Sequence, residues 1–246
     1  EVGIIKVEDA NGVLKGVAFN YGCHPSTLDL HILEFTEDWP YYSITGLKEE
    51  LGGDVWVAYF QSAQGDAKVG YTAELSAVGA DMHGLRSFEF AEYKGRLMVD
   101  PVVDELASIQ TDGDPDIAVA KQEISLPLRS TYPVTYDEAV KNHEAAEEKM
   151  AEMEANADQY GKRQLDFQRV EVFLTGQMVG RARWIEEDPN RDPLTGVWQQ
   201  SLRIGDAVFV TFPNEVFTEI GKKVKENSPY DKTFVIGLAS GHGGYI

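Results

Sequence analysis

The sequence predicts an α/β fold in which a layered mixed sheet is flanked by helices and a surface helical insertion occupies residues 134–168. Short runs rich in β-branched and aromatic residues recur along the chain, as expected for strands. Stretches with helical spacing separate these runs, which is the alternation typical of layered α/β folds. The 43% hydrophobic content of the 246 residues is enough for a sizeable core, so global disorder is not expected.

The first quarter of the chain alternates between strand and helix. Residues 3–8 alternate in polarity as a half-buried strand does, and an Asn-Gly turn leads to a partner strand at 13–19. The segment 39–51 has helical spacing and is followed by a glycine pair that ends the helix. The apolar run 55–61 then suits a buried strand.

The rest of the chain repeats this alternation. Residues 74–110 form a second helical stretch, which Gly84 and Gly95 weaken and Pro101 breaks. Residues 136–169 are rich in Glu, Lys, Ala, Met and Gln, which is typical of a long surface helix or a helical pair. The remaining expected elements are strands at 117–128, 173–183, 201–212 and 233–238 and a strand-to-helix transition at 213–224.

The composition excludes several classes of partner and site. Acidic residues outnumber basic ones by 41 to 22, for a net charge of −19, so we expect no binding to nucleic acid or to an anionic membrane surface. No apolar run approaches the ~20 residues that cross a bilayer, and no signal peptide is expected within the chain. The single cysteine, Cys23, excludes an intrachain disulfide and thiolate-rich zinc sites.

Three potential metal ligands each follow an apolar strand, where layered α/β folds usually hold their sites. His24 follows the second expected strand, Glu215 lies near a helix start, and Tyr245 ends the glycine-rich loop at 241–244. Each residue taken alone also has a structural interpretation. These are a buried histidine bonded to a carbonyl group, a solvated carboxylate at a helix start, and a core aromatic residue.

Four sequence blocks surround these residues in a characteristic order. They are NYGCHP at 20–25 leading to DWP at 38–40, FQSAQGD at 60–66, LRIGD at 202–206 leading to FPNEVF at 212–217, and GLASG at 237–241 leading to Tyr245. Together the blocks resemble the neutral/alkaline non-lysosomal ceramidase family. The resemblance spans most of the chain, and the helical stretch 134–168 matches least.

This resemblance implies a zinc-dependent hydrolase of an N-acyl amide bond, acting on a small or lipid-like substrate. It implies His24, Glu215 and Tyr245 as zinc ligands, with the metal polarising the amide carbonyl and activating water. His24 and Tyr245 would thereby serve catalysis, and the tyrosine oxygen would also stabilise the oxyanion. Lys68 replaces a serine that matters for activity in the family, so it is a candidate catalytic residue and indicates a substrate other than ceramide itself. Asp38 and Asp66 are expected to support the ligand loops.

The resemblance also implies that residues 1–246 form one partial catalytic domain, truncated at both ends, because the family's fourth ligand lies in an upstream His-x-His-Ser stretch. A secreted or other extracytoplasmic location follows from the same resemblance, while the oligomeric state stays open. One alternative is a non-catalytic binding module or an inactive fragment, and another is a metal-free hydrolase that uses Ser26. Acidic segments at 112–116 and 188–192 are spaced like calcium ligands, but we interpret them as polar turns.

Overall fold

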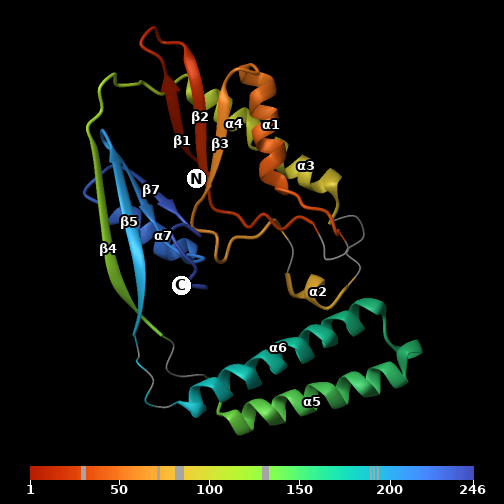
Figure 1. The fold of residues 1–246 in the computed structure, drawn as a ribbon. Coiled ribbons are helices and arrows are strands. Elements are labelled where there is room, and N and C mark those ends of the chain that lie inside the picture. Colours follow the sequence, from red (N-terminus) through yellow and green to blue (C-terminus); the bar gives the residue numbers. More distant parts are fainter. Residues whose placement is uncertain are drawn as a thin grey trace. The chain divides into compact units, whose positions relative to one another are not determined.

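The computed structural model describes residues 1–28, 32–70, 73–80, 86–128, 133–188, 190, 192 and 194–246. The chain divides into two compact units (Figure 1). The first unit comprises Glu1–Tyr71, Gly84–Ile124 and Gly196–Ile246, and the second comprises Thr72–His83 and Ser125–Thr195. All six site residues predicted from the sequence belong to the first unit.

The first unit begins with a three-stranded mixed sheet in the order β1-β2-β3 (Figure 1). β1 (Gly3–Glu8) pairs antiparallel with β2 (Leu14–Tyr21), and β2 pairs in parallel with β3 (Trp56–Gln61). Parallel neighbours need a crossover connection, which α1 (Trp39–Leu51) provides. Since β2 and β3 run in the same direction, the loops that follow them leave from the same edge of the sheet.

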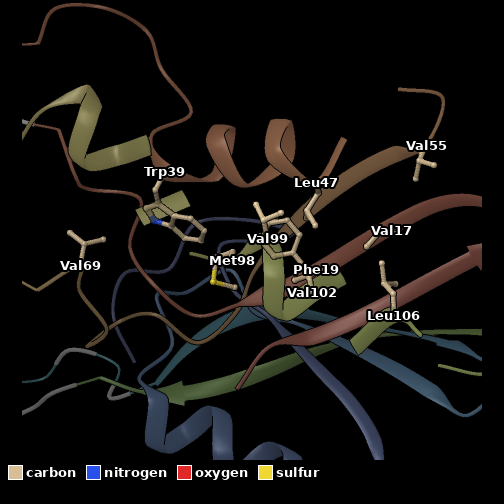
Figure 2. Packing of buried hydrophobic residues seen from close by; sticks show 10 residues of the cluster. All are labelled: Val17, Phe19, Trp39, Leu47, Val55, Val69, Met98, Val99, Val102 and Leu106. Atoms are coloured by element: carbon tan, nitrogen blue, oxygen red, sulfur yellow. The ribbon is translucent and has the colours of Figure 1, made fainter. Parts of the chain in front are cut away.

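Three helices build the main core against this sheet. α1 packs with α3 (Phe88–Arg96) and α4 (Val99–Leu106), and Gly95 allows the close approach because any side chain there would overlap the carbonyl oxygen of Trp39. Figure 2 shows the buried apolar side chains gathered between helices and strands. They are Val17, Phe19, Trp39, Leu47, Val55, Val69, Met98, Val99, Val102 and Leu106. This core holds the base of the loop that follows β2.

A second, four-stranded mixed sheet follows the order β4-β5-β6-β7. Its strands are β4 (Ile117–Pro127), β5 (Leu194–Ile204), β6 (Ala207–Thr211) and β7 (Lys232–Ile236). β5 and β6 form an antiparallel hairpin, whereas β6 and β7 are parallel and are connected through α7 (Thr218–Glu226). The segments that follow β6 and β7 therefore also leave from one common edge.

The carboxyl ends of the two parallel strand pairs meet within the first unit. The Asn20 side-chain amide donates to the carbonyl oxygens of Phe60 at 3.0 Å and Val235 at 3.1 Å, so it joins β2, β3 and β7. The N–H of Gly237 donates to the carbonyl of Gln61 at 2.9 Å. Four loops from distant parts of the sequence are thus brought to one place.

The second unit is dominated by a helical hairpin. It contains α2 (Ala73–Ala77), α5 (Tyr136–Ala155), the short 3₁₀ helix η1 (Ala157–Gln159) and α6 (Lys162–Glu187). A capping box between Thr135 and Glu138 starts α5. The buried α5 residues recur at intervals of seven, four and three, as a helix face requires, and they are Ala139, Ala146, Met150 and Met153. No helix in the described parts of the chain is long and apolar enough to span a membrane.

The α/β class and most expected elements are confirmed, but the strand predicted at 173–183 is wrong, because these residues lie inside α6. The local run of β-branched and aromatic residues favours a strand, yet packing against α5 along a helical repeat outweighs that preference. The break expected at Pro101 is present, because α3 ends at Arg96 and a new helix, α4, begins at Val99. Pro101 lies in the first turn of α4, where no intrahelical partner for its missing N–H is needed. Gly84 lies outside the described residues.

Candidate functional site

His24 lies in the loop that follows β2, and its backbone is held on both sides. Its N–H donates to the carbonyl of Ala67 at 2.9 Å, which ties it to the loop after β3. Its carbonyl accepts from the indole Nε1 of Trp39 at 3.2 Å and from the N–H of Ser26 at 2.9 Å. The side chain remains 18% exposed, so the fixed imidazole is accessible from solvent.

Glu215 and Tyr245 are paired through their backbones. They form an isolated parallel bridge, in which the N–H of Glu215 donates to Gly244 at 2.8 Å and the N–H of Ile246 donates to Glu215 at 3.2 Å. The positive φ of 66° at Gly244 is a conformation that glycine tolerates best. The segments after β6 and β7 thereby hold a carboxylate beside a phenol.

The three predicted ligands converge although they are up to 221 residues apart in sequence. Nε2 of His24 lies 3.6 Å from Oε2 of Glu215, and the ring centroids of His24 and Tyr245 are 6.2 Å apart. Loss of hydration raises the pKa of Tyr245, and a hydrogen bond to the Glu215 carboxylate raises it further, to about 12. The phenol is therefore protonated at neutral pH when no cation is bound. The residue is 58% exposed, so its side chain is accessible from solvent.

The imidazole of His24 and the carboxylate of Glu215 are groups of the kind that bind zinc in proteins. Zinc takes nitrogen and oxygen ligands at about 2.0–2.1 Å in tetrahedral geometry, so two ligands of one ion lie roughly 3.3 Å apart. The 3.6 Å between His24 and Glu215 is close to that separation. Across the described residues, no group of three or more His, Cys, Asp and Glu side chains is placed to hold a metal.

Asp38 closes the loop that carries His24. Its buried carboxylate accepts from the N–H of Thr27 at 2.9 and 3.1 Å, the Thr27 hydroxyl at 2.6 Å, the N–H of Leu28 at 3.1 Å and the N–H of Trp39 at 2.7 Å. The last bond also caps α1. Asp38 thus anchors the end of the His24 loop to the start of the helix whose indole holds the His24 carbonyl.

Asp66 anchors the segment that carries Glu215 in a similar way. Its carboxylate accepts from the N–H of Thr218 at 2.7 Å and from the Thr218 hydroxyl at 3.0 Å. Thr218 begins α7, whose own N-cap residue, Phe217, makes no side-chain capping bond. Asp66 therefore caps α7 from a different loop and ties the turn after β3 to the segment three residues beyond Glu215.

Lys68, Cys23 and two acidic segments are the other reactive groups that the sequence singled out. Lys68 is exposed and follows Ala67, the residue whose carbonyl binds His24. Burial raises the pKa of the Cys23 thiol to about 11, so it is not a thiolate at neutral pH. The acidic residues at 112–116, together with Asp188, Asn190 and Asp192, are exposed, and none belongs to a metal-holding group in the described structure.

Several residues that shape the site lie within the four sequence blocks but were not singled out individually. Trp39, Asn20 and Asn214 each make a hydrogen bond between segments distant in the chain, and Gln64 is buried between two of these segments. A buried amide looks like any other polar loop residue until its neighbours are known. Only the proline and glycine residues nearby indicated that the backbone turns there.

No family model matches the chain, and no curated protein sequence matches it. Solved structures do. One is neutral ceramidase from Pseudomonas aeruginosa, with a TM-score of 0.55 and 13% identity over 99% of this chain and 40% of that chain. Another is a ceramidase complexed with C2, with a TM-score of 0.56 and 11% identity over 99% of this chain and 41% of that chain. The chain thus spans about two fifths of those structures, and at these identities the similarity shows a ceramidase-like fold alone.

Proposed function

We propose that this chain is a zinc-dependent hydrolase of an N-acyl amide bond, with the metal held by His24, Glu215 and Tyr245. The observation that supports it best is the convergence of an imidazole, a carboxylate and a phenol from three segments at the ends of parallel strands. The ceramidase-like fold agrees with a substrate that is a lipid-like or small N-acylated molecule, and with an enzyme that works outside the cytoplasm.

The chemistry divides between the ion and the side chains. When bound, zinc would polarise the amide carbonyl and lower the pKa of a water molecule. His24 and Glu215 contribute a fixed pair of donors, because the backbones of both residues are hydrogen bonded to neighbouring loops. Without the ion, Tyr245 holds a proton on its phenol oxygen beside Glu215. In the proposed site this exposed oxygen alternates between binding the ion and, when protonated, donating a hydrogen bond to the developing oxyanion.

Metal content and affinity test the proposal. We expect about one zinc per chain by mass spectrometry and its loss in His24→Ala, because one of three donors is removed. The matched control is His143→Ala, since Nε2 of His143 also lies 3.6 Å from a carboxylate oxygen, that of Glu147, in the helical unit. This variant should keep its zinc.

Activity measurements then distinguish the proposed zinc hydrolase from the alternative functions. A screen of N-acylated substrates should show hydrolysis that disappears with His24→Ala and with a chelator. A wild-type chain that binds no zinc contradicts the proposal and leaves a non-catalytic binding module with the same fold. Hydrolysis that survives chelation would point instead to a metal-free nucleophile such as Ser26.

A further inference from the structure

Two buried side-chain amides near the candidate site make fewer hydrogen bonds than buried polar groups normally make. Gln64 is 0% exposed, and neither its Nε2 nor its Oε1 has a partner among the described residues. Asn214 is 1% exposed, and its Oδ1 likewise has none there. Buried polar groups are nearly always paired, and an apolar side chain of similar size would avoid the cost. Departures from such local rules concentrate at functional sites.

Gln64 lies at the centre of a loop that touches the segments of two donors. Three residues beyond it, the carbonyl of Ala67 accepts from the N–H of His24 at 2.9 Å. Directly after it, the N–H of Gly65 donates to Val216 at 2.8 Å, and a Cβ on Gly65 would lie only 2.6 Å from the carbonyl oxygen of Glu215. The backbone of the loop that carries Gln64 therefore contacts the segments of both donors.

Asn214 links the segments of the second and third donors. It directly precedes Glu215, and its Nδ2 donates to the carbonyl of Gly243, two residues before Tyr245, at 2.8 Å. The two amide residues also meet around Gly237, where a Cβ would lie 2.9 Å from Oε1 of Gln64 and 3.5 Å from the carbonyl oxygen of Asn214. Both amide residues therefore lie near Gly237, in segments that are joined to those of the three donors.

We propose that Gln64 and Asn214 are positioning residues, whose buried amides keep His24, Glu215 and Tyr245 within reach of one zinc ion. The inference rests on the proposed function, because it concerns the same ion. Neither amide is a ligand of that ion. Each acts through the backbone of the loops that carry the ligands, and outer groups of this kind commonly set metal affinity.

The test compares zinc affinity between matched glutamine variants by competition with a chromophoric chelator. Gln64→Met keeps the length of the side chain and removes its amide, and we expect about tenfold weaker zinc binding. Gln168→Met is the control, since Gln168 is also buried and its Nε2 donates to Ala146 at 3.0 Å in the helical unit. That variant loses a hydrogen bond but should bind zinc as the wild type does. Circular dichroism confirms that each variant is folded.

The outcomes separate this inference from the proposed function. Unchanged affinity in folded Gln64→Met, beside a wild type that binds zinc, overturns the positioning role alone. A wild type that binds no zinc overturns both. If Gln64→Met does not fold, Gln64→Asn replaces it, because its amide is one methylene too short to hold the same position. The same weakening is then expected, and affinity equal to the wild type again refutes the role.

Discussion

Replacing Asp38 with asparagine should destabilise the first unit and weaken the candidate metal centre together. Asp38 has φ 59° and ψ −148°, a backbone conformation that favours glycine and is held here by the bonds of its own side chain. Those bonds join the loop of His24 to the start of α1. The carboxylate thus couples the stability of the fold to the position of a proposed ligand.

The magnitude follows from the donors that surround this carboxylate. Three backbone N–H groups and one hydroxyl point at its two oxygens, over 2.6 to 3.1 Å. An asparagine keeps one acceptor oxygen and turns an NH₂ group toward the remaining N–H. A hydrogen bond to a charged group contributes about 1.5–3 kcal/mol, and an unpaired buried donor costs about 1–3 kcal/mol. We therefore expect Asp38→Asn to lower the free energy of unfolding by about 2–4 kcal/mol.

Urea unfolding followed by tryptophan fluorescence measures the effect, with chelator competition for zinc on the same samples. Asp9→Asn is the control, because Oδ1 of Asp9 accepts from the N–H groups of Asn11 and Val13 in an exposed turn, where water can replace it. It should cost less than about 1 kcal/mol and leave zinc affinity unchanged. A stability within about 0.5 kcal/mol of the wild type for Asp38→Asn would refute the reasoning, because the donors would then not depend on the charge.

Two further substitutions test a helix cap near the candidate site and the main hydrophobic core. Asp66→Ala should cost about 1 kcal/mol at pH 7, because α7 loses the cap that Asp66 provides at Thr218. Burial acts to raise the pKa of Asp66, but the bonds from Thr218 outweigh it and lower the pKa. The contribution is therefore fully present at neutral pH, starts to fall as the pH drops below the unfolded value of about 4, and is lost as the pH passes through the lowered folded pKa. A difference in urea unfolding that does not shrink as the pH is lowered below about 4 would contradict this. Leu47→Ala should cost about 2–5 kcal/mol by the same assay, since Leu47 is fully buried in the main core, and a loss under about 1 kcal/mol would mean that the core relaxes around the cavity.

The elements that follow local rules were predictable from the sequence. The helix expected at 39–51 has those bounds in the structure, because an aspartate caps its start and a glycine with φ 96° ends it. The Asn-Gly turn between β1 and β2 was equally clear, with Gly12 at φ 75°. The three donors were singled out by their neighbours in the sequence, and their role as zinc ligands stays a prediction.

The sequence by itself determined the layered class, the first hairpin and crossover helix, and the identity of His24, Glu215 and Tyr245 as candidates, because periodicity and turn chemistry act within a few residues. Only the tertiary structure decided that residues 173–183 are helical, that Asp66 caps a helix 152 residues away, and that the side chains of His24 and Glu215 lie 3.6 Å apart. These outcomes depend on packing between distant segments. The free energy of such contacts outweighs local helix and strand preferences. These contacts cannot be recognised from any short stretch of the sequence.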